Sequence, residues 1–173
     1  MAHIAYEQFQ AAVRASGRAW HIEQRDTYNV ASEDEPFGRF LAGAPDDYRW
    51  LAEWLGFIAE VTAAGTRVQR ARLVTVPHTD YSRWGLVVAE KLTAAGEDIR
   101  YLPRERAAGI ALPDEDFWLL DEDRLILSVF SADGRQGGYA SNDDPDLVIQ
   151  CRAVRDQVWS RAVDYHEYVS QTD

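Results

Sequence analysis

Carboxylates gather around the short apolar run 117–120. Four aspartates flank this run, namely Asp114, Asp116, Asp121 and Asp123. Two carboxylates as close as Asp114 and Asp116 can serve as a general acid and a general base where burial separates their pKa values. The sequence does not reveal that burial, but it makes this stretch the first candidate for acid–base chemistry.

Four arginines lie on or beside predicted strands, at Arg70, Arg72, Arg100 and Arg124. Arg70 and Arg72 are two residues apart, so they point to the same side of their strand. Strand interiors do not bury arginine without a partner. The nearby aspartates could supply partners, which predicts either arginine–aspartate pairs lining a cleft or a salt-bridge network on an exposed face.

A second group of reactive side chains lies where a predicted strand ends and a helix begins, at His78, Asp80, Tyr81, Arg83 and Trp84. In sheets with parallel strands this is the usual position of a ligand. The free amides of a helix N-terminus favour an anion there, but no glycine-rich loop is present to hold a nucleotide phosphate. The structural alternative is that Asp80 caps the helix while Tyr81 and Trp84 pack in the core.

Both groups contribute to one predicted cleft, formed by residues 77–84, 102–104 and 114–118 and covered on one side by residues 32–64. The ligand-binding candidates are His78, Asp80, Tyr81, Arg83, Trp84, Arg72, Arg100, Arg104, Asp114, Asp116 and Trp118. The catalytic candidates are Asp80, Tyr81 and Asp116.

Other kinds of chemistry lack the residues they need. Asp121-x-Asp123 lacks the glycine and the later glutamate of a calcium loop, and the four histidines show no ligand spacing. We therefore expect no metal and no cofactor. Cys151, the single cysteine, lies on an apolar helical stripe without a neighbouring activating group, so it is interpreted as structural.

Hydrophobic periodicity predicts the elements that must position these side chains. The predicted helices cover residues 5–16, 32–41, 48–64, 81–95 and 146–163. The predicted strands cover residues 18–24, 68–76, 99–102, 117–120, 125–130 and 137–141. A turn is expected at 130–134 and a frayed tail at 164–173.

Three features of this order indicate a sheet with helices around it. Residues 18–24 alternate apolar and polar side chains, as a half-buried strand does. A strand at 68–76, a helix and a strand at 99–102 predict a parallel pair joined by a crossover. The runs 117–120 and 125–130, joined by a charged tetrad, predict a hairpin at the centre of the sheet.

Composition and charge exclude several functional classes. The 173 residues fit one domain, and a hydrophobic share of 46% excludes a disordered chain. A net charge of −11 repels phosphate, which argues against direct nucleic-acid binding. No long apolar span or signal peptide is recognised, so we expect a cytoplasmic protein that does not bind membranes. A small molecule or a protein partner remains, and a homodimer stays open.

The order of elements from Arg67 onward resembles one repeat of the phospholipase D fold. In that family a strand carries a His-x-Lys-x4-Asp motif, and residues 119–128 resemble its latter half. With the motif's aspartate on Asp121, its histidine falls on Asp114 and its lysine on Asp116. The resemblance therefore implies the fold, while phosphodiesterase chemistry does not carry over.

Nearly the whole chain also resembles an uncharacterised actinobacterial family that is often encoded near helix-turn-helix regulators. The resemblance rests on Glu33-Asp34-Glu35-Pro36, Val74-Thr75-Val76-Pro77 with Asp80-Tyr81 and Arg83, Ala95-Gly96-Glu97-Asp98-Ile99-Arg100, and Asp116-Phe117-Trp118-Leu119-Leu120-Asp121. It implies a cytoplasmic partner or sensor in a regulatory pathway and no known activity.

The sequence thus predicts a single α/β domain with a mixed central sheet flanked by helices. Residues 1–66 form an N-terminal helical and strand extension, 67–163 a phospholipase D-like core, and 164–173 a tail. The expected function is a non-enzymatic regulatory module that binds a ligand or partner, in a signalling or transcription-linked pathway. One alternative is a small cofactor-independent enzyme of specialised metabolism that uses Asp80, Asp116 and Tyr81. Another is an obligate subunit that presents its acidic surface, or Trp50 and Trp54, to a basic partner.

Overall fold

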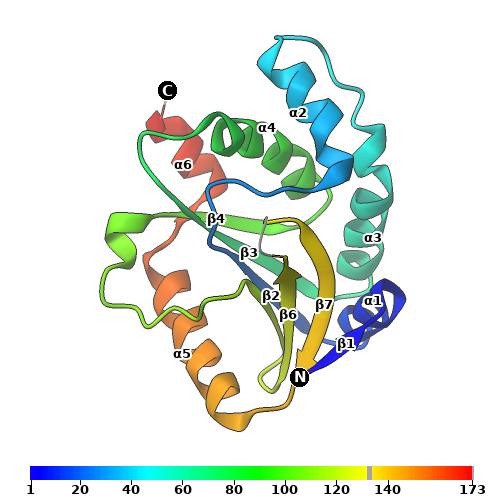
Figure 1. The fold of residues 1–173 in the computed structure, drawn as a ribbon, viewed down its shortest axis with the longest axis vertical. Coiled ribbons are helices and arrows are strands. Elements are labelled where there is room, and N and C mark those ends of the chain that lie inside the picture. The colour runs from blue at the N-terminus through cyan, green and yellow to red at the C-terminus, as the bar shows by residue number, and fades with distance from the viewer. Residues whose placement is uncertain (132–133, 173) are drawn as a thin grey trace.

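The computed structural model describes residues 1–131 and 134–172, and within them the chain forms one mixed sheet of eight strands with helices on both faces (Figure 1). The strands stand in the order β1-β7-β6-β5-β2-β3-β4-β8. This confirms the predicted single-domain α/β class. Residues 132 and 133 of the predicted turn lie outside the described residues.

The strands are β1 (Ala2–Ile4), β2 (Arg18–Glu23), β3 (Arg67–Val74), β4 (Asp98–Pro103), β5 (Phe117–Leu120), β6 (Arg124–Phe130), β7 (Gln136–Asn142) and β8 (Val163–Asp164). The helices are α1 (Tyr6–Arg14), α2 (Asp34–Leu41), α3 (Ala52–Ala63), α4 (Asp80–Ala94), α5 (Pro145–Arg161) and α6 (Tyr165–Thr172). Single-turn helices occur at Ala31–Glu33, Arg49–Leu51 and Arg104–Ala107.

The strand β2 joins the two halves of the sheet, since it pairs in parallel with β3 and antiparallel with β5. The predicted parallel pairing of β3 with β4 and the predicted hairpin of β5 and β6 are both present. The hairpin turn holds Asp121 at a φ of 53°, a left-handed conformation that aspartate tolerates better than most residues. Its Oδ1 accepts the backbone N–H groups of Gly17 and Arg18 at 2.9 and 3.0 Å, which fixes the turn to the start of β2.

Helices α4 and α5 begin at residues that cap them. The hydroxyl of Thr79 accepts the N–H of Ser82, so Thr79, and not Asp80, caps α4. The carboxylate of Asp144 accepts the N–H of Asp146 at 3.0 Å, and Pro145 follows in the first turn of α5. Such side chains satisfy amides that the helix itself leaves free.

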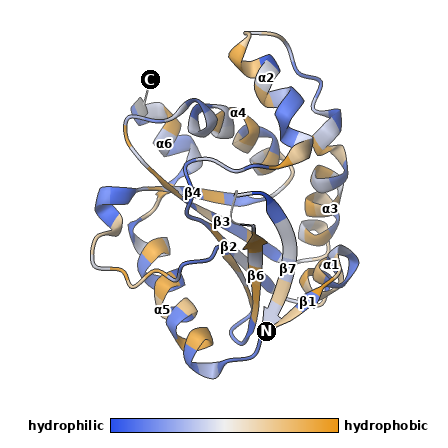
Figure 2. Ribbon diagram, viewed as in Figure 1, coloured by the Kyte–Doolittle hydropathy of each residue, from blue (hydrophilic) through white to orange (hydrophobic). Residues whose placement is uncertain are grey.

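Apolar side chains bury both faces of the sheet. Helix α5 covers one face, where Val154 and Val158 pack with Trp20 and Ile22. Helices α1 and α3 cover the opposite face over Val68, Trp118 and Leu120, while α4 and α6 cover β4. In Figure 2 the helices carry hydrophobic and hydrophilic residues in alternation, as expected when one side of each packs on the sheet.

Two predictions about the elements are wrong. Residues 18–24 were expected to be half-buried, but Trp20, His21 and Ile22 are all buried, because helices cover both faces of β2. The frayed tail expected at 164–173 is instead largely α6, which packs through Tyr165 and Tyr168. Two tyrosines one turn apart give this short helix an apolar side among otherwise polar residues. In the part of the chain that the structure describes, no helix is both long and apolar enough to cross a membrane.

Candidate functional site

A cavity of about 480 Å³ opens between the sheet and its cover. Its floor is the sheet face that α1 and α3 cover. Along β2 and β3 this face begins with the apolar Ala19 and Val68 and continues with polar side chains toward the strand ends. Helices pack on the apolar part and the cavity lies over the polar part. The segment 28–33 and residues of α3 and α4 form the walls.

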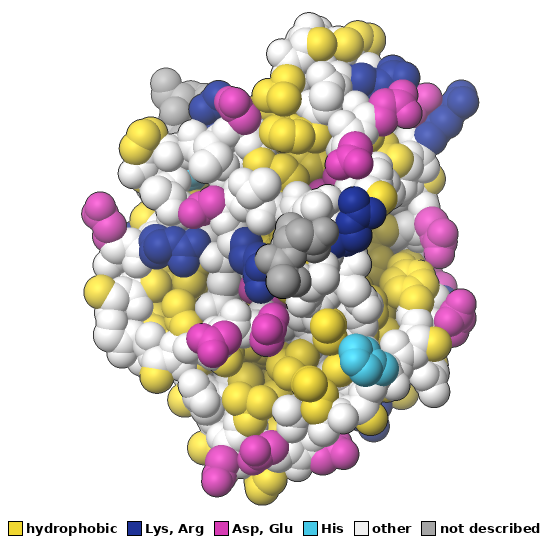
Figure 3. Space-filling model, viewed as in Figure 1, with side chains coloured by type: hydrophobic (Ala, Val, Ile, Leu, Met, Phe, Trp, Pro, Cys, Tyr) yellow, Lys and Arg dark blue, Asp and Glu magenta, His cyan; other side chains and the backbone are white. Residues whose placement is uncertain are grey.

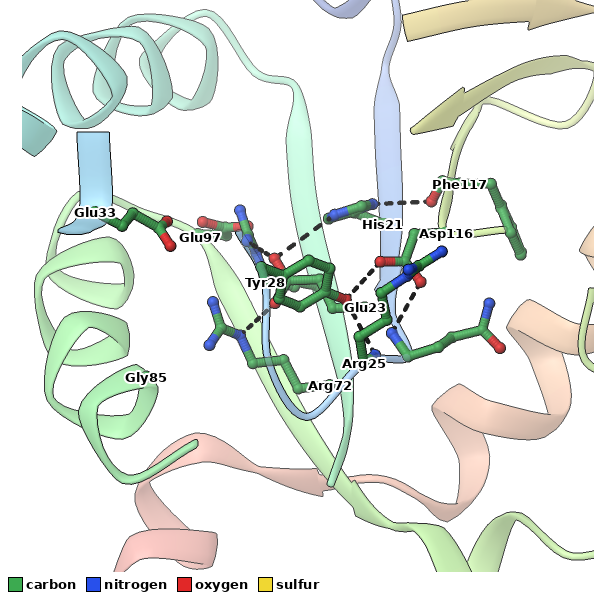
Figure 4. Close-up of polar contacts among 12 residues, drawn as sticks. His21, Glu23, Arg25, Tyr28, Glu33, Arg72, Gly85, Glu97, Asp116 and Phe117 are labelled. Atoms are coloured by element: carbon green, nitrogen blue, oxygen red, sulfur yellow. Dashed lines mark hydrogen bonds and ion pairs between the residues drawn. The ribbon is translucent and has the colours of Figure 1, made fainter. Parts of the chain in front are cut away.

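Four charged side chains form a buried ion network beneath the cavity (Figure 4). One oxygen of Glu23 pairs with Nη1 of Arg70, and the other lies 2.8 Å from Nε of Arg72. Nε of Arg70 also donates to Oε1 of Glu97 at 2.7 Å. The strand register brings these groups together, because the parallel pairing of β2 and β3 sets Glu23 opposite Arg72.

Electrostatic pairing outweighs burial in this network. Burial alone would raise the pKa of Glu23, but the charges of Arg70 and Arg72 hold that pKa well below its usual range. Burial likewise opposes the charge of both guanidinium groups, and Glu23 keeps their pKa values above the ordinary value. All three side chains therefore stay charged at neutral pH.

His21 lies beside the network in a fixed orientation. Its ring stacks on Trp118 with centroids 4.3 Å apart and planes inclined by 5°. Nδ1 lies 2.9 Å from the carbonyl oxygen of Phe117, and Nε2 lies 3.6 Å from Oε1 of Glu23. Contacts to both nitrogens and to one ring face leave the imidazole little freedom.

Asp116 occupies the edge of the floor, immediately before β5, and it is buried. The hydroxyl of Tyr28 donates to Oδ2, and the backbone N–H of Gln24 donates to Oδ1 at 2.9 Å. Burial raises the pKa of Asp116 even though these hydrogen bonds oppose the shift. Burial and the nearby carboxylate raise the pKa of Tyr28 well above its ordinary value, so its hydroxyl keeps the proton that it donates.

A second tyrosine–carboxylate pair lines the same cavity. The hydroxyl of Tyr81, in the first turn of α4, donates a hydrogen bond to Oε2 of Glu33. Burial raises the pKa of Glu33, and burial together with that carboxylate raises the pKa of Tyr81. The rings of Tyr28 and Tyr81 have centroids 6.1 Å apart, so the two pairs are neighbours.

Aromatic rings make up much of the remaining lining. They are Tyr6, Trp50, Trp54, Trp118, Phe130 and Tyr139, in addition to the two tyrosines of the pairs. Trp84 supports this wall from behind: its ring lies 5.5 Å from that of Trp50 and 5.4 Å from that of Tyr81. The cavity therefore combines aromatic surfaces with a comparable share of polar surface that includes buried charged groups, and small-molecule sites also place polar groups among apolar ones.

The structure brings four of the predicted site residues together in this cavity, namely Arg72, Tyr81, Asp116 and Trp118. They come from β3, α4, the residue before β5, and β5 itself. The segment 32–64, which was expected to cover one side of the predicted cleft, contributes Ser32, Glu33, Trp50, Leu51, Glu53 and Trp54 to the lining of this cavity.

The other predicted residues near the start of α4 do not line the cavity. His78 contacts the carbonyl oxygen of Thr75 at 3.1 Å and the hydroxyl of Tyr168 at 3.0 Å. Asp80 and Arg83 pair with each other on the exposed surface. Trp84 is buried in the core behind the wall.

Arg100, Arg104 and Asp114 also lie away from the cavity. Arg100 stacks over the ring of Trp159, with its guanidinium carbon 4.2 Å from the ring centroid. Arg104 donates to the carbonyl oxygen of Gln24 at 2.6 Å. Asp114 is exposed.

The expected arginine–aspartate pairs are a partial error, because the carboxylates that hold Arg70 and Arg72 are glutamates. Glu23 comes from a strand that the sequence assigned to the extension, and Glu97 follows α4. Asp116 pairs with Tyr28 instead of an arginine. Glu23, Tyr28 and Glu33 were missed as site residues, as were most of the aromatic lining residues.

One signal could have found Glu23. The pairs His21-x-Glu23 and Arg70-x-Arg72 both place polar or charged side chains two residues apart on predicted strands. Glu23 on one such strand and two arginines on another fit two neighbouring strands that present these side chains on the same face. In the described part of the chain, no group of three His, Cys, Asp or Glu side chains is placed to hold a metal ion.

The chain is therefore an α/β protein with a mixed sheet, and a cavity of about 480 Å³ opens over one face of that sheet. Comparison with known families matches residues 7–170 to a family described as a domain of unknown function, DUF6879, and the chain belongs to this family. Comparison with curated proteins gives no match.

Proposed function

We propose that the chain is a non-enzymatic module that binds a small molecule in the cavity above Glu23, Arg70 and Arg72, and that this binding serves a regulatory pathway. The cavity itself carries the proposal. A volume of about 480 Å³ is within the range of small-molecule sites.

The construction of the cavity floor supports this proposal. A fold that only needed a closed core would place apolar residues at the ends of β2 and β3. Instead it buries an ion network there, and replacing buried ion pairs by well-packed apolar residues is often neutral or stabilising. Retaining charges beneath an open volume fits a site that orients a ligand.

A small ligand is favoured over a protein partner by the exposed surface. Large exposed apolar side chains in the described residues are scattered over separate elements, at Met1, Leu41, Val76, Val87 and Ile149. Figure 3 shows charged side chains of both signs over one face, lying between groups of hydrophobic side chains. Interaction surfaces more often present a contiguous apolar patch. The regulatory part of the proposal rests on the sequence resemblance to a family encoded near regulators.

The test is a thermal-shift screen of a metabolite library containing cations, neutral molecules and anions. Val30→Trp places an indole in the cavity lining, while Val87→Trp makes the same change on the exposed side of α4. We expect at least one compound to raise the Tm of the wild type and of Val87→Trp but not of Val30→Trp. If no compound of any charge distinguishes the two variants, the proposal fails.

One observation favours a second candidate, a cofactor-independent enzyme. Asp116 is a buried carboxylate with a raised pKa that accepts a hydrogen bond from the hydroxyl of Tyr28 inside a cavity, and tuned groups of this kind carry out acid–base catalysis. Asp80 lies outside the cavity, so this candidate retains Asp116 and Tyr81. Conversion of a bound compound by the wild type, lost in Asp116→Asn and followed by mass spectrometry, would favour the enzyme.

A further inference from the structure

The charges that line the cavity do not balance. Four carboxylates line it, from Glu23, Glu33, Glu53 and Asp116, against two guanidinium groups. Both guanidinium groups are already engaged by Glu23, and Arg70 also pairs with Glu97 outside the lining. The negative charge of the other carboxylates is therefore left without a cationic partner in the wall.

Asp116, which is buried, and Glu33, which is half-buried, are the less exposed part of this excess. Within residues 1–131 and 134–172, neither carboxylate forms an ion pair with Lys, Arg or His. Each receives a tyrosine hydroxyl instead, Glu33 from Tyr81 and Asp116 from Tyr28. A hydroxyl hydrogen bond solvates a carboxylate but brings no positive charge, and an ionised carboxylate out of water is costly without such a charge.

The aromatic lining suits the same kind of ligand. The rings of Tyr28 and Tyr81 have centroids 6.1 Å apart, and each tyrosine donates a hydroxyl hydrogen bond to one of the two carboxylates. Trp50, from the single-turn helix Arg49–Leu51, and Trp54, from the start of α3, also line the cavity. Aromatic faces attract ammonium groups through their quadrupole, most strongly where water is excluded. The carbon skeleton of an amine would also bury its apolar surface against these rings.

The cavity offers fewer cationic contacts to an anionic ligand. Arg72 is the guanidinium with a single carboxylate partner, but its Nη1 faces α4. A Cβ on Gly85 of that helix would lie 2.5 Å from this nitrogen. In Figure 4 the guanidinium of Arg72 extends toward Gly85 and away from Asp116. That side of the group is therefore packed on the helix.

We infer that the ligand of the cavity is an organic amine in its protonated form, with Glu33 and Asp116 as counter-ions and the surrounding aromatic rings enclosing its carbon skeleton. This inference rests on the proposed function and adds the chemical class of the ligand. The net charge of −11 would also raise the concentration of such a cation near the protein.

The test compares ligands that share a skeleton and differ in charge. Butylamine, 2-phenylethylamine and tryptamine are each titrated beside the corresponding alcohol and carboxylate, with Kd measured by calorimetry at neutral pH. At least one amine is expected to bind more tightly than both of its analogues. Glu33→Gln should raise the Kd for that amine by about tenfold to hundredfold, which is the usual contribution of a hydrogen bond to a charged group.

Asp123→Asn is the matched control. It removes one negative charge from the exposed turn between β5 and β6, outside the cavity, so its amine Kd should be unchanged. Asp116→Asn should weaken the binding of the amine as Glu33→Gln does. If Asp116→Asn fails to fold, the result for Glu33→Gln alone tests the inference. Glu33 lies in the segment that covers the cavity and not in the sheet, so its replacement should leave the fold intact.

Two results would overturn the inference. One is that no amine binds more tightly than its alcohol and carboxylate analogues. The other is that Glu33→Gln and Asp123→Asn weaken amine binding equally, because the loss of affinity would then follow from the change in net charge alone. If only neutral molecules or anions bind in the cavity, the proposed function stands and the inference of an amine ligand is refuted. If the library screen finds no ligand at all, both the proposed function and the inference are refuted.

Discussion

Replacing Glu23 by glutamine tests whether the ion network under the cavity is held together as its geometry indicates. The side chains of Glu23, Arg70 and Arg72 are 13%, 9% and 15% exposed. Breaking a buried ion pair costs about 3–5 kcal/mol, because one charge stays buried without its partner. Arg70 keeps Glu97, so only Arg72 loses its carboxylate. We therefore expect Glu23→Gln to lower the free energy of unfolding by about 3 kcal/mol at pH 7.

The dependence of this loss on pH has a definite sign. The folded-state pKa of Glu23 lies below its ordinary value of 4.5, so its contribution is fully present above pH 4.5. Below that pH the unfolded chain takes up a proton that the folded chain does not. The advantage of the wild type over Glu23→Gln should then shrink by about 1.4 kcal/mol for each pH unit.

Urea unfolding followed by tryptophan fluorescence measures both quantities, as a shift in midpoint at unchanged slope. Glu60→Gln is the matched control: its pair with Arg14 is exposed, so no measurable loss is expected. Glu23→Gln combined with Arg72→Met should recover part of the stability, since the orphaned charge is gone. A loss below about 1 kcal/mol at pH 7, well under the range for a broken buried pair, would refute the reasoning. A loss that is the same at pH 3.5 and pH 7 would refute it as well.

Two further variants test how the cavity is built. Gly56→Ala, with open space around it in α3, should stabilise by about 0.5–1 kcal/mol through helix propensity. Gly85→Ala gains the same propensity, but its new Cβ would meet Nη1 of Arg72 at a cost of about 1–3 kcal/mol, so we expect a net loss of up to about 2.5 kcal/mol. Thermal melting compares the change in Tm of the two variants. Equal changes would contradict the close contact between α4 at Gly85 and the side chain of Arg72. The folded-state pKa of Asp116 is raised above 3.8, so ionising this group costs stability as the pH rises through the raised value. Asp116→Asn should therefore gain stability relative to the wild type between pH 4 and pH 7 in urea unfolding, and a constant difference would show that the carboxylate is not disfavoured in its charged form.

Local patterns predicted most of the elements, because each depends on neighbouring residues. The apolar runs 117–120 and 125–130 gave the hairpin, and the strand–helix–strand pattern from residue 68 gave the parallel pair. The alternation along residues 18–24 correctly separated Trp20 and Ile22 from His21 and Glu23. It did not show what lies over the polar side, because a strand facing a polar cavity has the same pattern as one facing water.

The candidate site was harder to predict because its parts are far apart in sequence. Glu23 and Arg72 meet only through the register of β2 on β3, and Glu97 joins them from beyond α4. Tyr28 and Glu33 lie in a connecting segment without periodicity, so no pattern marks them. Arg72 and Asp116 were predicted because strands rarely bury arginine unpaired and because aspartates gather before β5.

The position of β2 also has a consequence for how the chain is synthesised and folded. The partners of β2 on its two sides, β3 and β5, follow it by some tens and about a hundred residues, so its pairing is strongly non-local. Until β5 has left the ribosome, β2 presents an open edge with unpaired amides and carbonyls, the kind of edge that recruits strands from other chains. The N-terminal segment therefore cannot be removed without disrupting the fold, because it contains β2, the strand that joins the two halves of the sheet.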